Sequence, residues 1–450
     1  TTYVSKPYVL RPPLSPTVLL KEKDANGEIY QGDVWTNQDI YHDITIAETE
    51  GNVDKYQYSS DKSIWKDIEE TEDIIEYIKD KNTITYKYIS EVDATFYIKA
   101  IYEDKQDSGI TETKLKIDKT APKINSLTSE ITSANKAKVI VTDIVETASG
   151  VKGYYISTSK ETPTLESDWE KYEGEGFEVN NLEQDTTYYI WMLDNAGNIS
   201  EVKEIKTKKA NYSVDNNIYV ETLKDALENA ENNSNIKLLN DYTDSSTVTV
   251  DKNVSIDTQS YKLTRTEKIG IDGNNKEITL EINGNIETSS DINLIETTGR
   301  VVLNGTATIE SKTNNPNYET VYNTGNLLQI GTLKIKGYYK AIENRQIYTL
   351  NAGTVEATGN VNSSYAIYNY SDGNIINIEG GEVIGYIGVY NNNNSSLNIN
   401  SGKIEGTGNY GVYMTSGTLN MKDGEIIGKT DAIYISQAGT VNIETGYVKG

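Results

Sequence analysis

Few residues of this chain could perform acid–base or metal chemistry, and they are scattered. There is one histidine, His42, and no cysteine, so the sequence excludes a thiolate metal site and a disulfide framework. His42 lies far from the repeats of the C-terminal half, and we expect it at the surface. The arginines Arg265, Arg300 and Arg345 stand alone in the sequence. The acids that could approach one another on the early repeats are Asp257, Asp272, Asp291 and Glu296.

An enzyme that cleaves a saccharide would need such groups together on one face of the repeats, so that one of them can transfer a proton to or from the bound substrate. No repeat carries a dense cluster of aspartates, and the only histidine lies outside the repeats. The sequence therefore predicts no catalytic residue, no metal ligand and no cofactor. It leaves open whether the N-terminal half holds calcium.

A short phrase recurs through the C-terminal half and sets its architecture. Each copy reads glycine, any residue, then valine or isoleucine, at spacings of 28, 21, 22 and 22 residues. The glycines are Gly353, Gly381, Gly402, Gly424 and Gly446. Each repeat also carries a small-apolar-tyrosine phrase and an apolar-asparagine-apolar phrase, with no helical period between them. This pattern predicts a solenoid with three short strands in each coil of about 22 residues.

Period-two alternation predicts which side chains of the repeats face outward. If Val383, Val389, Leu397 and Ile399 point inward, the tyrosine and the asparagine of each repeat point outward and align along the axis. The tyrosine ladder is Tyr368, Tyr390, Tyr413 and Tyr434. The asparagine ladder is Asn377, Asn398, Asn420 and Asn442. Both ladders could be structural, through stacked rings or shared amide hydrogen bonds. Alternatively, the tyrosines could form a contact strip for a glycan or a protein.

The N-terminal half reads as short strands separated by polar turns, which favours β-sandwiches. The strands expected in its first part are Asp33–Thr36, Lys55–Tyr58, Thr83–Ile89 and Ala94–Ile101. In Leu182–Ser200, a leucine, a polar turn and a tyrosine precede an alternating strand, as in a tyrosine corner. Within it, Asp194-Asn-Ala-Gly-Asn198 predicts a hairpin turn.

One amphipathic helix is expected just before the repeats. Leu223, Ala226, Leu227 and Ala230 stand at helical spacing, and we expect this helix to cover the apolar end of the first coil. The predicted divisions are an extended segment 1–16, sandwiches 17–119 and 120–208, a linker 209–218, and a solenoid 219–450 with its cap helix at about 221–231.

The repeats, from about Tyr219 to Gly450, resemble the right-handed parallel β-helix of the pectate-lyase-like fold, as found in surface proteins of Gram-positive bacteria. Asp118-Lys-Thr-Ala-Pro122 and Asp194-Asn-Ala-Gly-Asn198 resemble phrases of bacterial Ig-like domains, whereas Glu103–Gly109 departs from that pattern. The resemblance implies an all-β chain: two Ig-like β-sandwiches, then a right-handed parallel β-helix with a short N-terminal capping helix. Lyases, hydrolases, phage tailspikes and adhesins share this fold, so it does not choose an activity.

Charge and composition narrow the possible partners. A formal net charge of -25 argues against nucleic acid and anionic membranes, because their phosphates would be repelled. The sequence contains no run of about 20 apolar residues, the length that a helix needs to span a bilayer. The chain has 34 tyrosines against 2 phenylalanines, so many rings are expected to reach water. Because Gly446 begins a further repeat just before the chain stops, we expect a piece of a longer exported protein.

We therefore expect a non-catalytic adhesion or display protein, extracellular and on the surface of a Gram-positive bacterium, with the Ig-like domains as spacers. Its expected contact residues are Tyr368, Tyr390, Tyr413 and Tyr434. Its expected partner is a glycan or a host or matrix protein, with self-association left open, no nucleic acid and no membrane insertion. Two alternatives remain: a structural stalk or self-assembling filament subunit, and a polysaccharide lyase or hydrolase of the β-helix type.

Overall fold

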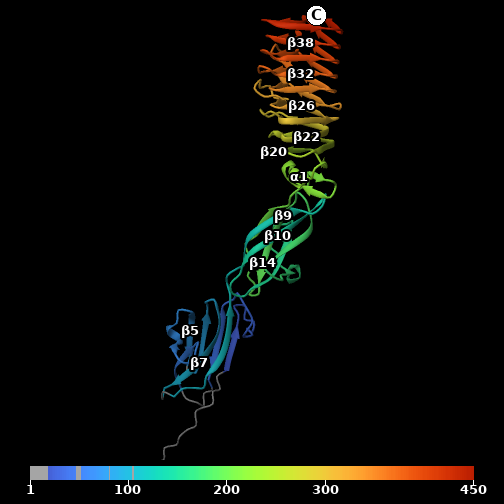
Figure 1. The fold of residues 1–450 in the computed structure, drawn as a ribbon. Helices are drawn as coiled ribbons and strands as arrows, with labels where there is room; N and C mark the ends of the chain where they lie inside the picture. Colours follow the sequence, from blue (N-terminus) through green and yellow to red (C-terminus); the bar gives the residue numbers. More distant parts are fainter. Residues whose placement is uncertain (1–18, 47–51, 81, 104–105) are drawn as a thin grey trace, which may run out of the picture. The chain divides into compact units, whose positions relative to one another are not determined.

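A computed structural model describes residues 19–46, 52–80, 82–103 and 106–450. The chain divides into two units, each described by itself below. One runs to Thr207 without Ile131–Ala137, and the other runs from Lys208 to Gly450 with that segment. The described residues are mostly β-strands, as Figure 1 shows. The expected extended segment 1–16 lies outside the described residues.

The first sandwich consists of two antiparallel sheets with strand orders β1-β2-β6-β5 and β4-β3-β7-β8. Their core includes Tyr56, Ile84 and Ile98, all fully buried. The elements are β1 Leu19–Lys23, β2 Ile40–Thr45, β3 Val53–Ser59, β4 Lys66–Asp67, a 3-10 turn Ile68–Glu70, β5 Ile74–Asp80, β6 Thr83–Tyr88, β7 Val92–Tyr102 and β8 Thr111–Ile117. The expected strand Asp33–Thr36 is wrong, because the chain turns there with Asp33 at a φ of 75°.

The second sandwich has sheets of order β13-β10-β9 and β12-β11-β14-β15. Its elements are β9 Lys123–Ile131, β10 Lys136–Val145, β11 Val151–Ser157, a 3-10 turn Glu166–Asp168, β12 Glu170–Lys171, β13 Gly176–Glu183, β14 Thr187–Asp194 and β15 Lys203–Lys206. The tyrosine corner is confirmed, because the Glu183 N–H donates to the Tyr188 hydroxyl at 3.1 Å. The hairpin turn is also confirmed: the Asp194 N–H donates to the Asn198 carbonyl, and Gly197 has a φ of 94°.

The C-terminal unit is a parallel β-helix, which confirms the predicted solenoid. Its first elements are β16 Tyr212–Val214, β17 Ile218–Val220, α1 Leu223–Asn229, β18 Ser234–Leu238, β19 Tyr242–Asp244, β20 Val248–Val250, β21 Val254–Arg265, β22 Ile269–Thr288 and β23 Ile295–Gly305. Strand β16 pairs with β18 and Tyr212 is fully buried. Within the linker expected at 209–218, Tyr212–Val214 and Ile218 instead belong to strands of the solenoid sheet.

From β24 onward, every third strand pairs in parallel, so the coil has three sides. The first side holds β25 Val321–Asn323, β28 Lys340–Asn344, β31 Tyr365–Asn369, β34 Ile387–Asn391, β37 Tyr410–Met414 and β40 Asp431–Ile435. The second holds β26 Asn326–Gln329, β29 Ile347–Leu350, β32 Ile375–Ile378, β35 Ser396–Ile399, β38 Gly417–Met421 and β41 Gly439–Ile443. The third holds β24 Thr308–Ser311, β27 Lys334–Gly337, β30 Thr354–Ala357, β33 Glu382–Gly385, β36 Lys403–Gly406, β39 Glu425–Gly428 and β42 Tyr447–Lys449.

The inward residues of the three sides stack into one continuous core. Val383, Val389, Leu397 and Ile399 are fully buried, as alternation predicted. Each buried aliphatic side chain of this kind contributes about 1.5–3 kcal/mol. The repeated glycine is required at the corner before the third side: Gly402 has a φ of 91°, and a Cβ there would lie 2.8 Å from the carbonyl of Gly381.

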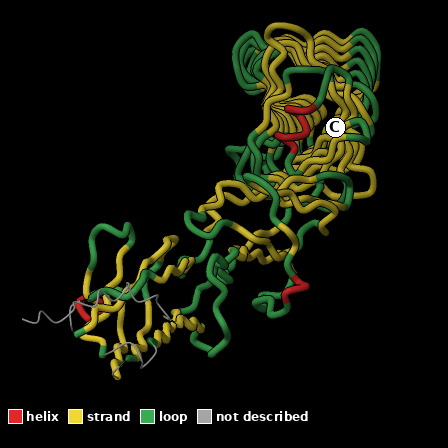
Figure 2. Tube along the Cα trace, turned by 90° about the horizontal axis from the view of Figure 1, so that it is seen from below, coloured by secondary structure: helices red, strands yellow, loops and turns green. Residues whose placement is uncertain are grey.

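Helix α1 caps the first coil, as predicted. Thr222 begins it with a capping box to Asp225, and Leu223, Ala226 and Leu227 are buried in the solenoid core. Figure 2 shows the helix lying across the end of the stacked coils. The apolar face of α1 thus removes the end of the core from water, as a solenoid requires.

Candidate functional site

The tyrosine ladder lies on the first side of the solenoid, in register over four coils. Tyr368, Tyr390, Tyr413 and Tyr434 are successive partners in the parallel pairings of β31, β34, β37 and β40. The rings of Tyr390 and Tyr413 stack at 4.8 Å between centroids and 9° between planes. The predicted alignment of these four residues is therefore confirmed.

Three further tyrosines join the ladder and widen it into a patch. Tyr365 lies 5.4 Å from Tyr368 between ring centroids, Tyr370 lies 5.7 Å from Tyr368, and Tyr410 lies 4.7 Å from Tyr434. We call these seven residues the tyrosine patch: Tyr365, Tyr368, Tyr370, Tyr390, Tyr410, Tyr413 and Tyr434. Tyr370 and Tyr434 are 43% and 39% exposed, and the others are half-buried.

Strict alternation hides two of the additional tyrosines, Tyr365 and Tyr410. Tyr365 and Tyr368 are three positions apart, which places them on opposite faces of a regular strand. Instead, Ala366 and Ile367 are both buried, so the strand bends and both tyrosines face outward. The bend requires a small residue: at Gly411, in the same phrase of a later coil, a Cβ would lie 2.7 Å from the carbonyl of Ala432. The small residue of the small-apolar-tyrosine phrase is the signal that could have revealed the bend.

The patch exposes ring edges and hydroxyl groups more than ring faces. Stacked partners cover faces within the ladder, as for Tyr390 with Tyr413 and Tyr410 with Tyr434. No patch hydroxyl makes a hydrogen bond to another residue that the structure describes. Burial raises the pKa of Tyr368 to about 12, so this hydroxyl stays protonated and can both donate and accept. The patch can therefore offer a row of amphipathic contacts to a partner.

A charged cluster adjoins the patch where the ladder begins. Lys340 is hydrogen-bonded to Glu319, and its Nζ lies 2.7 Å from Oε2 of Glu343. Burial raises the pKa of Glu319 to about 7, against the pull of Lys340. Burial also opposes ionisation of Glu343, but the hydrogen bond from Lys340 lowers its pKa below the ordinary value. Glu343 thus favours its ionised form, whereas burial favours the protonated form of Glu319.

Two of the three arginines that stand alone in the sequence are held by carboxylates in the structure. Arg345 donates from Nε to Oε1 of Glu343 at 2.8 Å, and its guanidinium lies 4.2 Å from the ring centroid of Tyr370. Arg265 is fully buried with its Nη1 2.6 Å from Oδ1 of Asp244. The Arg265 pair fixes the start of the solenoid, so this guanidinium is not available to a substrate.

The asparagine ladder expected on the outer face is confirmed on the second side of the coil. Asn377, Asn398, Asn420 and Asn442 are in register, and the amide nitrogens of the last three each donate to the amide oxygen of the preceding coil, whereas that of Asn377 donates to the Thr349 hydroxyl. We call these four residues the outer ladder.

A second asparagine ladder, inside the first side of the coil, was missed by the sequence reasoning. Its members are Asn323, Asn344, Asn369 and Asn391, which are fully buried, in register and joined by amide hydrogen bonds of 2.7–2.9 Å. We call these four residues the inner ladder. The signal was present, because each follows an inward valine or isoleucine by two positions, as Asn391 follows Val389.

His42 is buried, so the expected surface position is wrong. It is 1% exposed, stacked on Tyr86 at 4.7 Å between ring centroids, with Nδ1 3.0 Å from Oε1 of Glu22. Alternation in β2 explains the burial, because His42 shares the inward face with Ile40 and Ile44. The histidine belongs to the core of the first sandwich.

The four acids of the early coils do not gather into one site. Each is held by a different neighbour: Asp257 by Gln259, Asp272 by Asn274, Asp291 by Asn315 and Glu296 by Lys268. Within the described ranges, one group of three acids brings its carboxylate oxygens within 4.8 Å of one another: Asp118, Glu146 and Asp194.

This acidic group lies in the second sandwich and uses the aspartates of both Ig-like phrases. Asp118 accepts the Ser149 N–H at 3.0 Å, and Asp194 accepts the Asn198 N–H at 2.7 Å. Burial raises the pKa of both Glu146 and Asp194. These residues could hold a divalent cation such as calcium, which prefers carboxylate oxygens.

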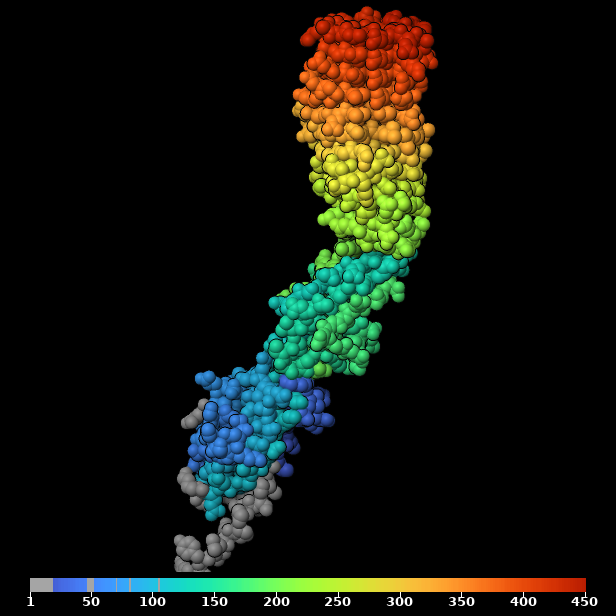
Figure 3. All heavy atoms as spheres, viewed as in Figure 1, coloured from blue at the N-terminus to red at the C-terminus, as the bar shows by residue number. Residues whose placement is uncertain are grey.

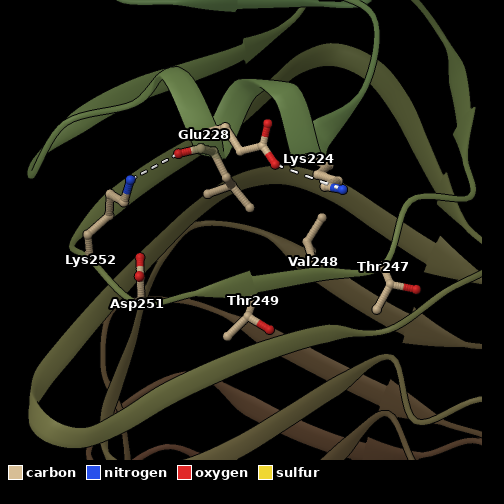
Figure 4. A pocket seen from close by; sticks show the side chains of 8 residues that line it. Lys224, Glu228, Thr247, Val248, Thr249, Asp251 and Lys252 are labelled. Atoms are coloured by element: carbon tan, nitrogen blue, oxygen red, sulfur yellow. Dashed lines mark hydrogen bonds and ion pairs between the residues drawn. The ribbon is translucent and has the colours of Figure 1, made fainter.

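A hollow of about 220 Å³ lies between α1 and β20 (Figure 4). Lys252 borders it and donates to the carbonyls of Leu227 and Ala230 at the end of the helix. These bonds satisfy the helix C-terminus, so the hollow is a gap in the packing of the cap. The face of the solenoid drawn in Figure 3 is shallow, without a deep cleft.

The fold defines a class: an all-β chain of Ig-like sandwiches followed by a β-solenoid, an arrangement that fits a structural or display role. No protein-family model and no curated protein matches the chain. Domains A168–A170 of titin are 12% identical, covering 43% of this chain and 68% of theirs with a TM-score of 0.27. The chicken CNTN1 FN1–FN3 domains are 16% identical, covering 44% and 68% with a TM-score of 0.21. At such scores, the fold assignment rests on the sheet pairings described above.

In the part of the chain that the structure describes, no helix is both long enough and apolar enough to cross a membrane.

Proposed function

We propose that this chain is a non-catalytic display protein of a Gram-positive bacterial surface, and that the tyrosine patch binds a protein partner outside the cell. The observation that carries the proposal is a patch of seven tyrosine rings in mutual contact on the first side of the solenoid. The Ig-like sandwiches act as spacers. The rigid coils hold the rings in place, so little conformational entropy is lost when a partner binds.

The ring geometry favours a protein over a glycan as the occupant of the patch. A sugar ring stacks on an exposed aromatic face, but Tyr390 and Tyr413 cover one another's faces. A protein interface instead uses tyrosine edges and hydroxyls as amphipathic contacts, and tyrosine is enriched at such interfaces. The adjoining carboxylates argue against catalysis, because Glu319 and Glu343 are 2% and 4% exposed and tied to Lys340.

The test is an array of matrix proteins and glycans, probed with the purified chain and analysed for reaction products by mass spectrometry. Two variants divide the patch into hydroxyls and rings: Tyr390→Phe with Tyr413→Phe removes the hydroxyls, and Tyr390→Ser with Tyr413→Ser removes the rings as well. We expect retention on at least one protein, weakened about ten-fold or more by the serine variant and less by the phenylalanine variant.

Other outcomes would assign a different function to the chain or to the tyrosine patch. Retention on glycans alone that the serine variant abolishes would make the patch a saccharide site. Release of unsaturated or shortened saccharides would favour the lyase or hydrolase alternative. No retention at all, or retention that survives the serine substitutions, would overturn the assignment of the patch and favour a stalk or filament subunit.

A further inference from the structure

A second surface, on the second side of the coil, carries a different chemistry from the tyrosine patch. The outer ladder and the residues just beyond its strands border an open hollow of about 430 Å³. The rim beyond the ladder is formed by Asn400, Lys422 and Glu444, one from each successive coil. The hollow thus runs along the solenoid axis rather than into the core.

The floor of the hollow has unused hydrogen-bonding capacity at every step. Each asparagine amide has two N–H donors and an oxygen with two lone pairs. Asn398 uses one donor on Asn377 at 2.9 Å, and its oxygen accepts one bond from Asn420 at 3.0 Å. One N–H and one lone pair of such an amide therefore remain available to a ligand.

The rim adds two charged groups of opposite sign. Lys422 and Glu444 are exposed, and neither side chain is paired with another described residue. The Asn400 amide on the rim donates to the carboxylate of Glu379 at 2.9 Å, which adds a second acid beside the hollow. Because acids outnumber the one cation there and the whole chain carries a net charge of -25, the surface does not favour a polyanion. It fits an uncharged molecule whose groups can both donate and accept hydrogen bonds.

The spacing of the floor indicates an extended polymer. Parallel strands repeat at about 4.8 Å, so the four amides span on the order of 14 Å. Each sugar residue of an extended polysaccharide advances the chain by a length similar to this strand repeat. Each also presents hydroxyls that can donate and accept hydrogen bonds. A peptide strand would dock on a sheet edge instead, where main-chain groups are open.

We propose that the hollow over the outer ladder binds an extended, uncharged polysaccharide, with its chain parallel to the solenoid axis. This site is separate from the tyrosine patch and does not depend on the function proposed for the patch. Amide groups on the floor bind the sugar hydroxyls, and Lys422 and Glu444 bind hydroxyls along the rim. Several such bonds are needed, because each competes with water and contributes only about 0.5–1.5 kcal/mol.

Affinity electrophoresis tests the proposal directly. The chain is run in gels that contain hydroxyethyl cellulose, xyloglucan, galactomannan or dextran, with polygalacturonate as the charged control. We expect at least one uncharged polymer to retard the chain and polygalacturonate to leave it unaffected. The double variant Asn398→Val, Asn420→Val should weaken the affinity about ten-fold, since it removes two amides from the floor.

Two further variants keep the result decisive. Lys422→Ala changes only the exposed rim, so it should weaken retardation even if the valine variant proves less stable. Tyr390→Phe with Tyr413→Phe alters the other side of the coil and should leave retardation unchanged. The proposal is overturned if no uncharged polymer retards the chain, or if retardation survives both the valine and the alanine substitutions. It is equally overturned if the phenylalanine variant abolishes retardation, because the tyrosine patch would then be the site.

Discussion

The inner and outer ladders use the same residue type at the same spacing in opposite surroundings. Inside the first side of the coil, Asn344 is fully buried, and its amide nitrogen donates to Asn369 and also reaches the carbonyls of Gln346 and Ile375. On the second side, Asn420 is exposed, and its amide bonds to its ladder neighbours. The inner amides satisfy backbone groups that water cannot reach, whereas the outer amides satisfy one another.

Residue type and register therefore do not decide whether a ladder is structural. A buried polar group that loses its partner costs about 1–3 kcal/mol, whereas an exposed group exchanges its partner for water. The inner ladder is therefore expected to hold the fold, and the outer ladder is left free for binding.

The largest expected effect is that of Asn344→Ala. The substitution removes one hydrogen bond from each of Asn323, Asn369 and the carbonyls of Gln346 and Ile375 inside the coil, which should lower the free energy of unfolding by about 3–5 kcal/mol. Urea unfolding can assign the loss to the solenoid. All four tryptophans, Trp35, Trp65, Trp169 and Trp191, precede it, so their fluorescence follows the sandwiches, and far-UV circular dichroism reports the solenoid as well.

The matched control for this variant is Asn398→Ala on the outer ladder, which should change stability by less than about 1 kcal/mol. The comparison between the ladders fails if the two alanine variants lose similar stability. It also fails if the tryptophan transition shifts together with the dichroism transition in Asn344→Ala.

Much of the coil could be predicted because its determinants are local. The glycine spacing gave the coil length, and alternation gave the burial of Val389 and Leu397 and the alignment of Tyr390 with Tyr413. Alternation also predicts the burial of His42 and Asn391, because each lies two positions from an inward aliphatic residue. His42 was expected at the surface because it is polar, and the sequence analysis made no prediction for Asn391, although both positions face inward in the alternation.

Other features depend on contacts that no local pattern encodes. The bend at Ala366 and Ile367 breaks the period of two, so Tyr365 joins the patch unexpectedly. The pairing of Lys340 with Glu319 depends on how one coil returns beside the previous one. Likewise, Asp118 and Asp194 meet only because the sandwich folds the two phrases together.

The buried carboxyl group of Glu319 is expected to make the stability of the solenoid depend on pH. Burial raises the pKa of Glu319 from 4.5 to about 7, so between these pH values the folded state binds more protons than the unfolded state. The stabilisation is therefore present below about pH 4.5 and is lost as the pH rises through about 7. The expected loss is roughly 2–3 kcal/mol.

The measurement is the difference in unfolding free energy between the chain and its Glu319→Gln variant, taken from pH 5 to pH 8. The variant should lack this part of the pH dependence, since glutamine does not titrate. Equal slopes for the two proteins would show that Glu319 does not hold its proton on folding.

A smaller effect is expected where the inner ladder ends. Asn391 is followed in register by Met414 and then Ile435, so the column changes from amide to apolar at the next coil. Asn391→Met moves this change back by one coil and removes the acceptor of the Asn369 amide. We expect a loss of about 1–2 kcal/mol, smaller than for Asn344→Ala because fewer partners are stranded. Urea unfolding followed by circular dichroism would check the order, and an equal loss would mean that position along the ladder does not matter.

The smallest effect is expected for Asn420→Thr on the outer ladder. Threonine already occupies this column at Thr349, where its hydroxyl accepts the amide of Asn377 at 3.2 Å, and threonine suits a strand better than asparagine. The free energy of unfolding should therefore stay within about 0.5 kcal/mol of the unmodified chain. A loss above about 2 kcal/mol would make the outer ladder structural like the inner one, and the hollow above it would no longer be a surface that the fold leaves free for a ligand.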